Sequence, residues 1–261
     1  MKHFIITRFF SDPFGKTDEQ MLSFLNEETL QNGFILLKNH FIKTLQNQLN
    51  KNFEIVILIY NELPLQSVSF LNEIECDYKI HIIHSKDLNK FIYNFYDNDF
   101  IITTRLDYDD FVHKNCVQDV QLAALDTNYL KLYGLNNGCT MDNNEIPYFF
   151  HPKYISIKHD FFSCFETLIV NTKNYKRPIN IYHLGNHTKV CEYLIDNYKK
   201  FGLDDITQIQ TQLDKDEKTK YIWYRHENAV SLIRNNAKHT TNVIINDVNF
   251  EDFGYISHKN R

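Results

Sequence analysis

Three carboxylates lie within four positions of one another at Asp107, Asp109 and Asp110. Carboxylates this close repel one another unless a positive charge lies between them, and a hard divalent cation is a common solution. Mg²⁺ or Mn²⁺ bound through one or two protein oxygens keeps open positions that a diphosphate can fill. In an extended or turning segment Asp107 and Asp109 project to the same side. The spacing therefore predicts a Mn²⁺ or Mg²⁺ site.

A second interpretation of these residues needs no metal. Aspartate is a favoured N-cap residue, so Asp109 and Asp110 could simply cap a helix that we expect from about Val112 to Leu125. Arg105 beside the cluster favours the first interpretation, because a guanidinium is a good partner for phosphate or carboxylate. A calcium loop is disfavoured, since neither its turn glycine nor its bidentate Glu is present at the required positions.

The elements that must position this segment follow from hydrophobic patterning. Apolar runs rich in β-branched and aromatic residues predict strands at 4–10, 53–60, 78–84 and 100–104. Helices are expected at about 34–48, after a break at Asn32-Gly33, and at 65–73 and 88–96. This βαβαβαβ alternation predicts a parallel sheet with helices on both faces. Ligands bind beyond the carboxyl ends of such strands, and the acidic cluster comes directly after one of them.

The second half of the chain has a weaker pattern. Strands are expected at 129–133, 154–158 and 166–171, whereas the charged stretch 204–220 is interpreted as a solvated loop or helix face. No linker rich in Pro, Gly or Ser divides the sequence. We therefore expect a single domain over 1–261, with a ligand-binding half at 1–125 and a second half at 126–261.

Composition excludes several classes of protein. A net charge of -5 with dispersed basic residues lacks the footprint of a nucleic-acid binder. The seven glycines form neither a dinucleotide fingerprint nor a P-loop. Five cysteines without a C-x-x-C pair argue against a disulfide framework and favour a reducing compartment. No apolar run reaches the ~18 residues that a transmembrane helix needs. His183 and His187 have helical zinc-site spacing, but Gly185 lies between them, so we interpret that spacing as coincidence.

The segment T-x-R-L-D-x-D-D at 103–110, with a strand before it, resembles the D-x-D region of nucleotide-sugar glycosyltransferases with the GT-A fold. More narrowly, the sequence is similar to the bacterial family known as putative rhamnosyltransferases. The similarity extends to Thr7-Arg8-Phe9 in the first strand and to a late segment, WYRHEN at 223–228. It implies an α/β fold with a GT-A-like, Rossmann-type mixed sheet, mostly parallel in the N-terminal half and flanked by helices.

The resemblance also implies roles for particular residues. Asp107 would face the nucleoside of the donor, with Arg8 and Arg105 beside the nucleotide. Asp109 would coordinate the cation, and Asp110 would support either Asp107 or Asp109, which makes it a second candidate metal ligand. His226 would be the third metal ligand, with His187 as the second choice for that position.

The implied reaction is displacement of a nucleoside diphosphate from a donor sugar by an acceptor hydroxyl. An inverting enzyme needs a carboxylate base on the acceptor, and Asp160 and Glu166 are the candidates. The implied partners are a nucleotide-sugar donor, with rhamnose as one option for the sugar, and a glycan or lipid-linked glycan acceptor in bacterial surface polysaccharide synthesis. We expect a cytoplasmic protein with no nucleic-acid partner, and leave open peripheral contact with the inner face of the membrane.

Two other functions compete with this hypothesis. A sugar nucleotidyltransferase also needs carboxylates and Mg²⁺, but it usually carries a glycine-rich N-terminal loop, and only Gly15 lies near the first strand here. A non-catalytic binding protein, in which the aspartates merely cap a helix, is the third option.

Overall fold

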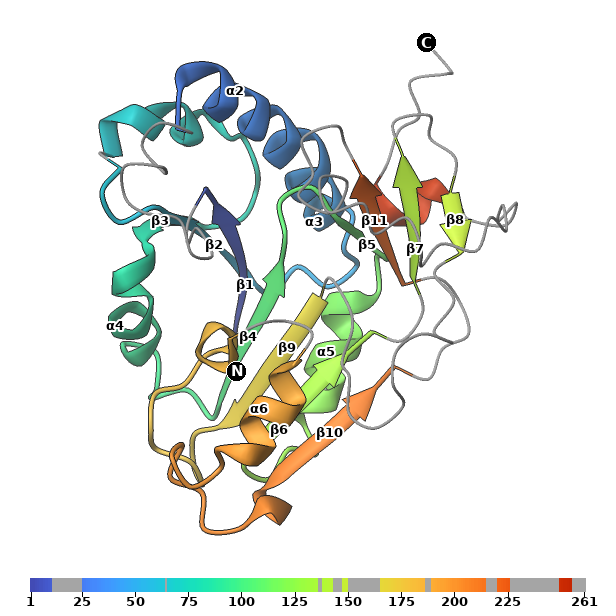
Figure 1. Ribbon diagram of the computed structural model, residues 1–261. Helices are drawn as coiled ribbons and strands as arrows, with labels where there is room; N and C mark the ends of the chain where they lie inside the picture. The colour runs from blue at the N-terminus through green and yellow to red at the C-terminus, as the bar shows by residue number, and fades with distance from the viewer. Residues whose placement is uncertain are drawn as a thin grey trace.

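The computed structural model describes residues 1–10, 25–63, 65–135, 138–142, 147–149, 165–185, 189–214, 220–225 and 249–254. Its centre is a mixed seven-stranded sheet with the strand order β10-β6-β9-β4-β1-β2-β3 (Figure 1). The strands are β1 (Lys2–Phe9), β2 (Glu54–Ile59), β3 (Ile80–His84), β4 (Phe100–Leu106), β6 (Leu130–Gly134), β9 (Phe165–Asn171) and β10 (Ile209–Leu213). Strands β3, β2, β1 and β4 are mutually parallel, and only β9 runs antiparallel to its neighbours. This confirms the predicted mixed sheet with a parallel N-terminal half.

A second, four-stranded sheet lies beside the first in the order β5-β11-β7-β8. Its strands are β5 (Phe111–Val112), β7 (Gly138–Asp142), β8 (Pro147–Phe149) and β11 (Tyr221–Arg225). Strand β5 follows directly on the acidic segment after β4. The acidic segment therefore lies where the chain passes from the large sheet to the small one.

Helices cover both faces of the large sheet. One continuous helical stretch comprises α2 (Glu27–Leu36), the π-helix η1 (Leu37–Ile42) and α3 (Lys43–Gln46). The other α-helices are α4 (Leu88–Tyr93), α5 (Cys116–Ala124) and α6 (Val190–Asp196). The 3₁₀ segments are η2 (Leu65–Glu73), η3 (Ser85–Asp87), η5 (Ile181–Leu184), η7 (Ile206–Gln208) and η9 (Phe250–Phe253). In the described part of the chain no helix has the length and apolarity to span a bilayer.

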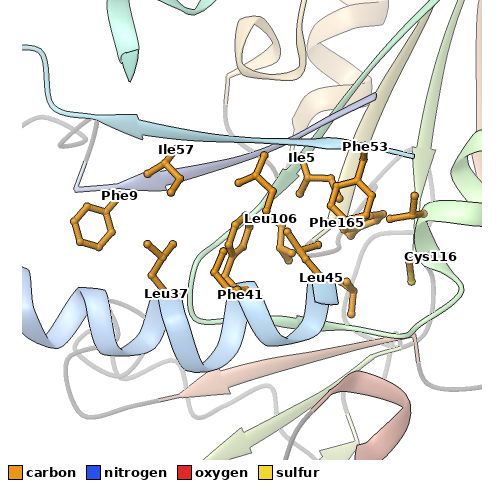
Figure 2. Close-up of a cluster of buried hydrophobic side chains, with 14 of the residues drawn as sticks. Ile5, Phe9, Leu37, Phe41, Leu45, Phe53, Ile57, Leu106, Cys116 and Phe165 are labelled. Carbon is orange, nitrogen blue, oxygen red and sulfur yellow. The ribbon is translucent and has the colours of Figure 1, made fainter. Parts of the chain in front are cut away.

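The two faces of the sheet bury separate apolar clusters. Figure 2 shows the first cluster, in which Leu37, Phe41 and Leu45 of the long helical stretch point at side chains of the strands. The strand residues labelled there are Ile5, Phe9, Ile57, Leu106 and Phe165. Helices α4 and α6 and the segment η5 cover the opposite face through the second cluster. Burial on both sides explains the almost unbroken apolar run in β2.

The long helical stretch begins earlier than expected. Its N-cap is Asn26, whose side chain accepts a hydrogen bond from the Thr29 amide at 2.9 Å, so the expected start at 34 was wrong. Gly33 does not break the helix but is buried within it. A Cβ at Gly33 would lie 2.4 Å from the Phe10 ring, so the glycine permits a close approach of that ring.

Three further expected elements differ from the structure, and a fourth lies outside the described residues. The helix expected from about Val112 begins at Cys116, because Phe111 and Val112 instead form β5. The stretch 204–220 is not a solvated loop throughout, because β10 within it pairs in parallel with β6. The expected strand at 154–158 lies outside the described residues. The helix expected at 65–73 is the 3₁₀ segment η2, with a kink at Val68.

We expect Gly138→Ala to destabilise the protein by about 1–3 kcal/mol, the usual cost of overpacking. Gly138 pairs with Tyr221 across β7 and β11, and an added Cβ would lie 2.0 Å from the Tyr221 ring, which is buried. Urea unfolding measures this change. Tyr221→Leu should remove the clash, so the double variant should lose less stability than the two single changes added together. Strict additivity would contradict this packing argument.

Candidate active site

The acidic segment forms a turn at the carboxyl end of β4. The Asp110 amide donates to the Asp107 carbonyl at 3.2 Å, and β5 follows immediately. Helix α5 starts six residues after Asp110, with Asn115 as its N-cap residue. Asp109 and Asp110 therefore do not cap this helix, and the capping interpretation of the acidic cluster was wrong.

The strand order places this turn at a point where ligands bind in sheets of this kind. From β1 the chain proceeds to β2 and β3 on one side, and then returns to β4 on the other side of β1. The carboxyl ends of β1 and β4 therefore flank the switch in strand order, where open α/β sheets have their binding crevice. Arg8 lies at the end of β1, and Asp107 directly follows β4.

Two arginines share one carboxylate at this switch point. The Asp107 Oδ1 atom lies 3.7 Å from Arg8 Nη2, and 3.5 Å from both Nε and Nη2 of Arg105. Burial opposes the charge of Arg105, but Asp107, Tyr182 and Glu166 together raise its pKa above the ordinary value. Both guanidiniums are thus held beside the acidic turn; their role in nucleotide binding stays a prediction.

Tyr182, on η5, covers the two arginines. Its ring centroid lies 5.8 Å from the Arg8 guanidinium carbon and 5.6 Å from that of Arg105, within the range of a cation–π interaction. Its hydroxyl donates to the Ile6 carbonyl at 3.3 Å. Burial raises the pKa of Tyr182 to about 12, so the phenol stays neutral. The sequence analysis missed this residue, because nothing in its neighbourhood marks it among sixteen tyrosines.

The segment η5 is itself fixed by a capping box. The Asn180 side chain accepts from the Tyr182 amide at 3.0 Å, and His183 Nδ1 accepts from the Asn180 amide at 3.1 Å. The Ile181 amide donates to Thr103 Oγ1 on β4. His183 therefore has a structural role. His187, which has helical zinc-site spacing from it, lies outside the described residues.

Glu166 lies opposite Arg105 in the antiparallel pairing of β9 with β4. Its side chain is buried, and neither carboxyl oxygen has a hydrogen-bond partner among the described residues. Burial raises the pKa of Glu166 well above its usual value, although Arg105 and Arg8 oppose this rise. Of the two candidate bases, Glu166 therefore lies in the cluster, whereas Asp160 falls outside the described residues.

A polar seam, formed by residues of the long helical stretch and of the segment just after it, holds the acidic turn on the face of the sheet opposite Tyr182. The seam consists of His40 and Thr44 in that stretch and of Gln48, two residues beyond its end at Gln46; all three are buried and spaced four residues apart. His40 Nδ1 donates to the Asp109 carbonyl at 3.1 Å. Thr44 Oγ1 donates to the Val112 carbonyl at 2.8 Å and accepts from the Val112 amide at 2.9 Å.

Gln48 extends the seam to the start of α5. Its amide nitrogen donates to the His113 carbonyl, and its carbonyl accepts from the Val117 amide, each at 3.1 Å. His40 lies within the π-helix η1, and such irregular turns are frequent at functional sites. The four-residue spacing of polar residues was a signal that the sequence analysis did not use.

The predicted metal site is only partly described by the structure. Carboxylate oxygens are ligands that Mg²⁺ and Mn²⁺ prefer, and the acidic turn supplies them. Within the described ranges, however, no three side chains of His, Cys, Asp or Glu converge as a metal site requires, and the proposed third ligand His226 lies outside those ranges. The metal therefore stays a prediction.

The strand order defines a mixed α/β sheet with its switch point between β1 and β4, and the two arginines and the acidic turn lie at that point. Residues 6–193 match the sequence profile of the family described as "Putative rhamnosyl transferase", and the chain belongs to that family. The matched region includes both arginines, the acidic turn, Glu166 and Tyr182. No match was found among curated proteins.

Several solved structures are similar to this chain. TarS 1-349 of S. aureus in complex with UDP has a TM-score of 0.42 and 14% identity, covering 86% of this chain and 61% of that one. A putative nucleotide-diphospho-sugar transferase from Desulfovibrio desulfuricans has a TM-score of 0.40 and 10% identity, covering 86% and 82%. A putative glucose-1-phosphate thymidylyltransferase from Bacillus anthracis has a TM-score of 0.40 and 15% identity, covering 98% and 99%. The chain thus spans about three fifths of the TarS 1-349 chains.

Proposed function

We propose that this protein transfers a sugar from a nucleotide donor to a glycan acceptor in bacterial surface polysaccharide synthesis. The family description makes rhamnose the first sugar to test. The observation that carries the proposal is the pair of arginines beside the acidic turn, at the switch in strand order. Guanidiniums bind phosphate oxygens well, and a binding crevice is expected at this position of the sheet.

In this proposal Arg8 and Arg105 hold the diphosphate and neutralise the charge that develops on it as the bond to the sugar breaks. Such fixed charges, aimed at the leaving group in a site of low polarity, are a large source of rate enhancement. Asp109, Asp110 and His226 would hold Mn²⁺ or Mg²⁺, which would supply further neutralisation of the same diphosphate when bound.

Glu166 is the candidate base that the described structure supports. A general base works best when its pKa lies near the working pH, and burial moves the Glu166 carboxyl in that direction. In this role it would take the proton from the acceptor hydroxyl, after a change that exposes it to the acceptor. Asp160 stays a second candidate on sequence grounds alone. Lipid-linked acceptors and contact with a membrane face are also part of the proposal.

Titration calorimetry with UDP, GDP and dTDP in the presence of Mn²⁺ tests the proposal. We expect one of these nucleotides to bind, and expect Asp109→Ala to weaken that binding at least about tenfold, as loss of a metal ligand would. Without Mn²⁺ the variant and the wild type should differ little. Two results would contradict the proposal: no binding of any nucleotide, or release of pyrophosphate from a nucleoside triphosphate and a sugar phosphate, which is nucleotidyltransferase activity.

A further inference from the structure

The contacts between Asp107 and the two arginines are long for a charged pair. The three nitrogen–oxygen distances are 3.5 to 3.7 Å, whereas strong charge-assisted hydrogen bonds measure about 2.7–2.9 Å. A short hydrogen bond to this carboxylate therefore does not fix the positions of the two guanidiniums. The Tyr182 ring and the pairing of β4 with β1 and β9 supply that placement.

In the described part of the chain, the carboxylate of Asp107 lies beside two guanidiniums, those of Arg8 and Arg105. Glu166 is buried behind them, where ionisation of a carboxyl is disfavoured, and neither of its oxygens has a hydrogen-bond partner in the described part of the chain. Two partly buried guanidiniums side by side favour an anion that carries more than one negative charge.

Asp107 is the most exposed of the three charged side chains. Its side chain is 33% exposed, against 15% for Arg8 and 6% for Arg105. It also lies beyond the last residue of β4, in the turn that leads to β5. The arginines, in contrast, belong to paired strands in the middle of the sheet.

We propose that Asp107 acts as an internal anion, which occupies the phosphate position between Arg8 and Arg105 in the free protein and gives way when a diphosphate binds. This inference rests on the proposed function for the identity of that diphosphate, namely the diphosphate of the nucleotide donor. Displacement frees the Asp107 carboxylate to turn toward the nucleoside, the role that the family resemblance implies. The same residue thus blocks the empty site and contacts the filled one.

Binding of inorganic pyrophosphate in metal-free buffer at low salt tests this exchange. An internal competitor lowers apparent affinity in proportion to the time that it occupies the site, so its removal strengthens binding. We expect Asp107→Asn to bind pyrophosphate about fivefold more tightly than the wild type in calorimetry. Asp107→Ser should change the affinity in the same direction, which guards against a folding defect in either variant.

Asp109→Asn is the matched control, because it removes the same charge two residues further along the turn. If the loss of any negative charge near the arginines strengthened pyrophosphate binding, both variants would gain the same affinity. The proposed exchange predicts instead that the affinity of Asp109→Asn for pyrophosphate rises by less than about twofold. Three results would overturn the proposed exchange between Asp107 and the diphosphate. The first is an equal gain in pyrophosphate affinity in the Asp107 and Asp109 variants, the second is no gain in the Asp107 variants, and the third is no pyrophosphate binding by any of these proteins.

Titration of the same proteins with UDP, GDP and dTDP and Mn²⁺ separates this inference from the proposed function. Nucleotide binding by the wild type without a specific gain in Asp107→Asn refutes the exchange alone. A specific gain in pyrophosphate binding without binding of any nucleotide refutes the proposed function, and leaves the exchange as a property of a diphosphate site.

Discussion

Replacing Arg105 by methionine is expected to lower kcat/KM for sugar transfer by about 10²–10³, the loss typical when a fixed group that stabilises transition-state charge is removed. Arg105 is 6% exposed, lies within 3.5 Å of Asp107 and contacts the Tyr182 ring. Its charge is therefore worth more than that of a surface residue, because little water screens it. Turnover should be measured with the sugar donor whose nucleotide binds most tightly.

Two further variants serve as controls for the effect of Arg105→Met on kcat/KM. Arg105→Lys keeps the charge but loses the planar fork of donors, so we expect an intermediate loss of activity. Arg177→Met removes an exposed guanidinium outside the cluster and should leave kcat/KM unchanged. Circular dichroism must show that Arg105→Met remains folded. Full activity in a folded Arg105→Met protein would contradict the role assigned to this residue.

Lowering the pH from 6.5 to 4.5 is expected to cost about 2 kcal/mol of stability through His3 alone. His3 is fully buried in the sheet, and burial lowers its pKa from 6.5 to about 3. Its Nδ1 accepts from the Gln121 amide at 3.3 Å, which leaves Nε2 to donate to Thr104 Oγ1 at 2.8 Å. Thr104 in turn is 2.7 Å from Thr167 on β9, so a neutral imidazole fits this network.

The sign of the effect follows from proton binding. Between about pH 3 and pH 6.5 the unfolded chain binds a proton at His3 that the folded chain does not, so acid favours unfolding throughout this window. Urea unfolding at pH 6.5 and pH 4.5 measures the change. Because other groups titrate too, His3→Gln is the control: it keeps hydrogen-bonding groups but cannot titrate, so its stability should depend less on pH by about 2 kcal/mol. Identical pH dependence in the two proteins would refute the prediction.

Much of the large sheet could be predicted from apolar patterning. Strands buried on both faces, such as β2, are nearly unbroken apolar runs, and their alternation with helices implies parallel pairing. Strand β10 was missed because it lies at the edge of the sheet, where polar residues such as Gln210 and Gln212 alternate with apolar ones. The start of α2 was missed because Gly33 signals a helix end by local propensity, whereas the contact with Phe10 that requires it is tertiary.

In the candidate site, too, some residues could be predicted from the sequence and others could not. Arg8, Arg105 and Asp107 were predictable because they lie at strand ends that strand order brings together. Tyr182 was not, since its place over the arginines depends on the capping box of η5 and on packing across the sheet. Glu166 was proposed as a base from its chain position, but its register opposite Arg105 could be known only from the pairing of β9 with β4.

The polar seam has a consequence for how this protein responds to a ligand. The main-chain groups of Asp109, Val112 and His113 each form a hydrogen bond with a buried side chain of the polar seam, so the turn that carries the aspartates cannot close over the site like a flap without breaking several of these bonds. Adjustment at that turn falls to side-chain rotamers, which change far faster than a loop closes. We therefore expect the main chain of the acidic turn to stay in place when a ligand binds, and its carboxylates to reorient.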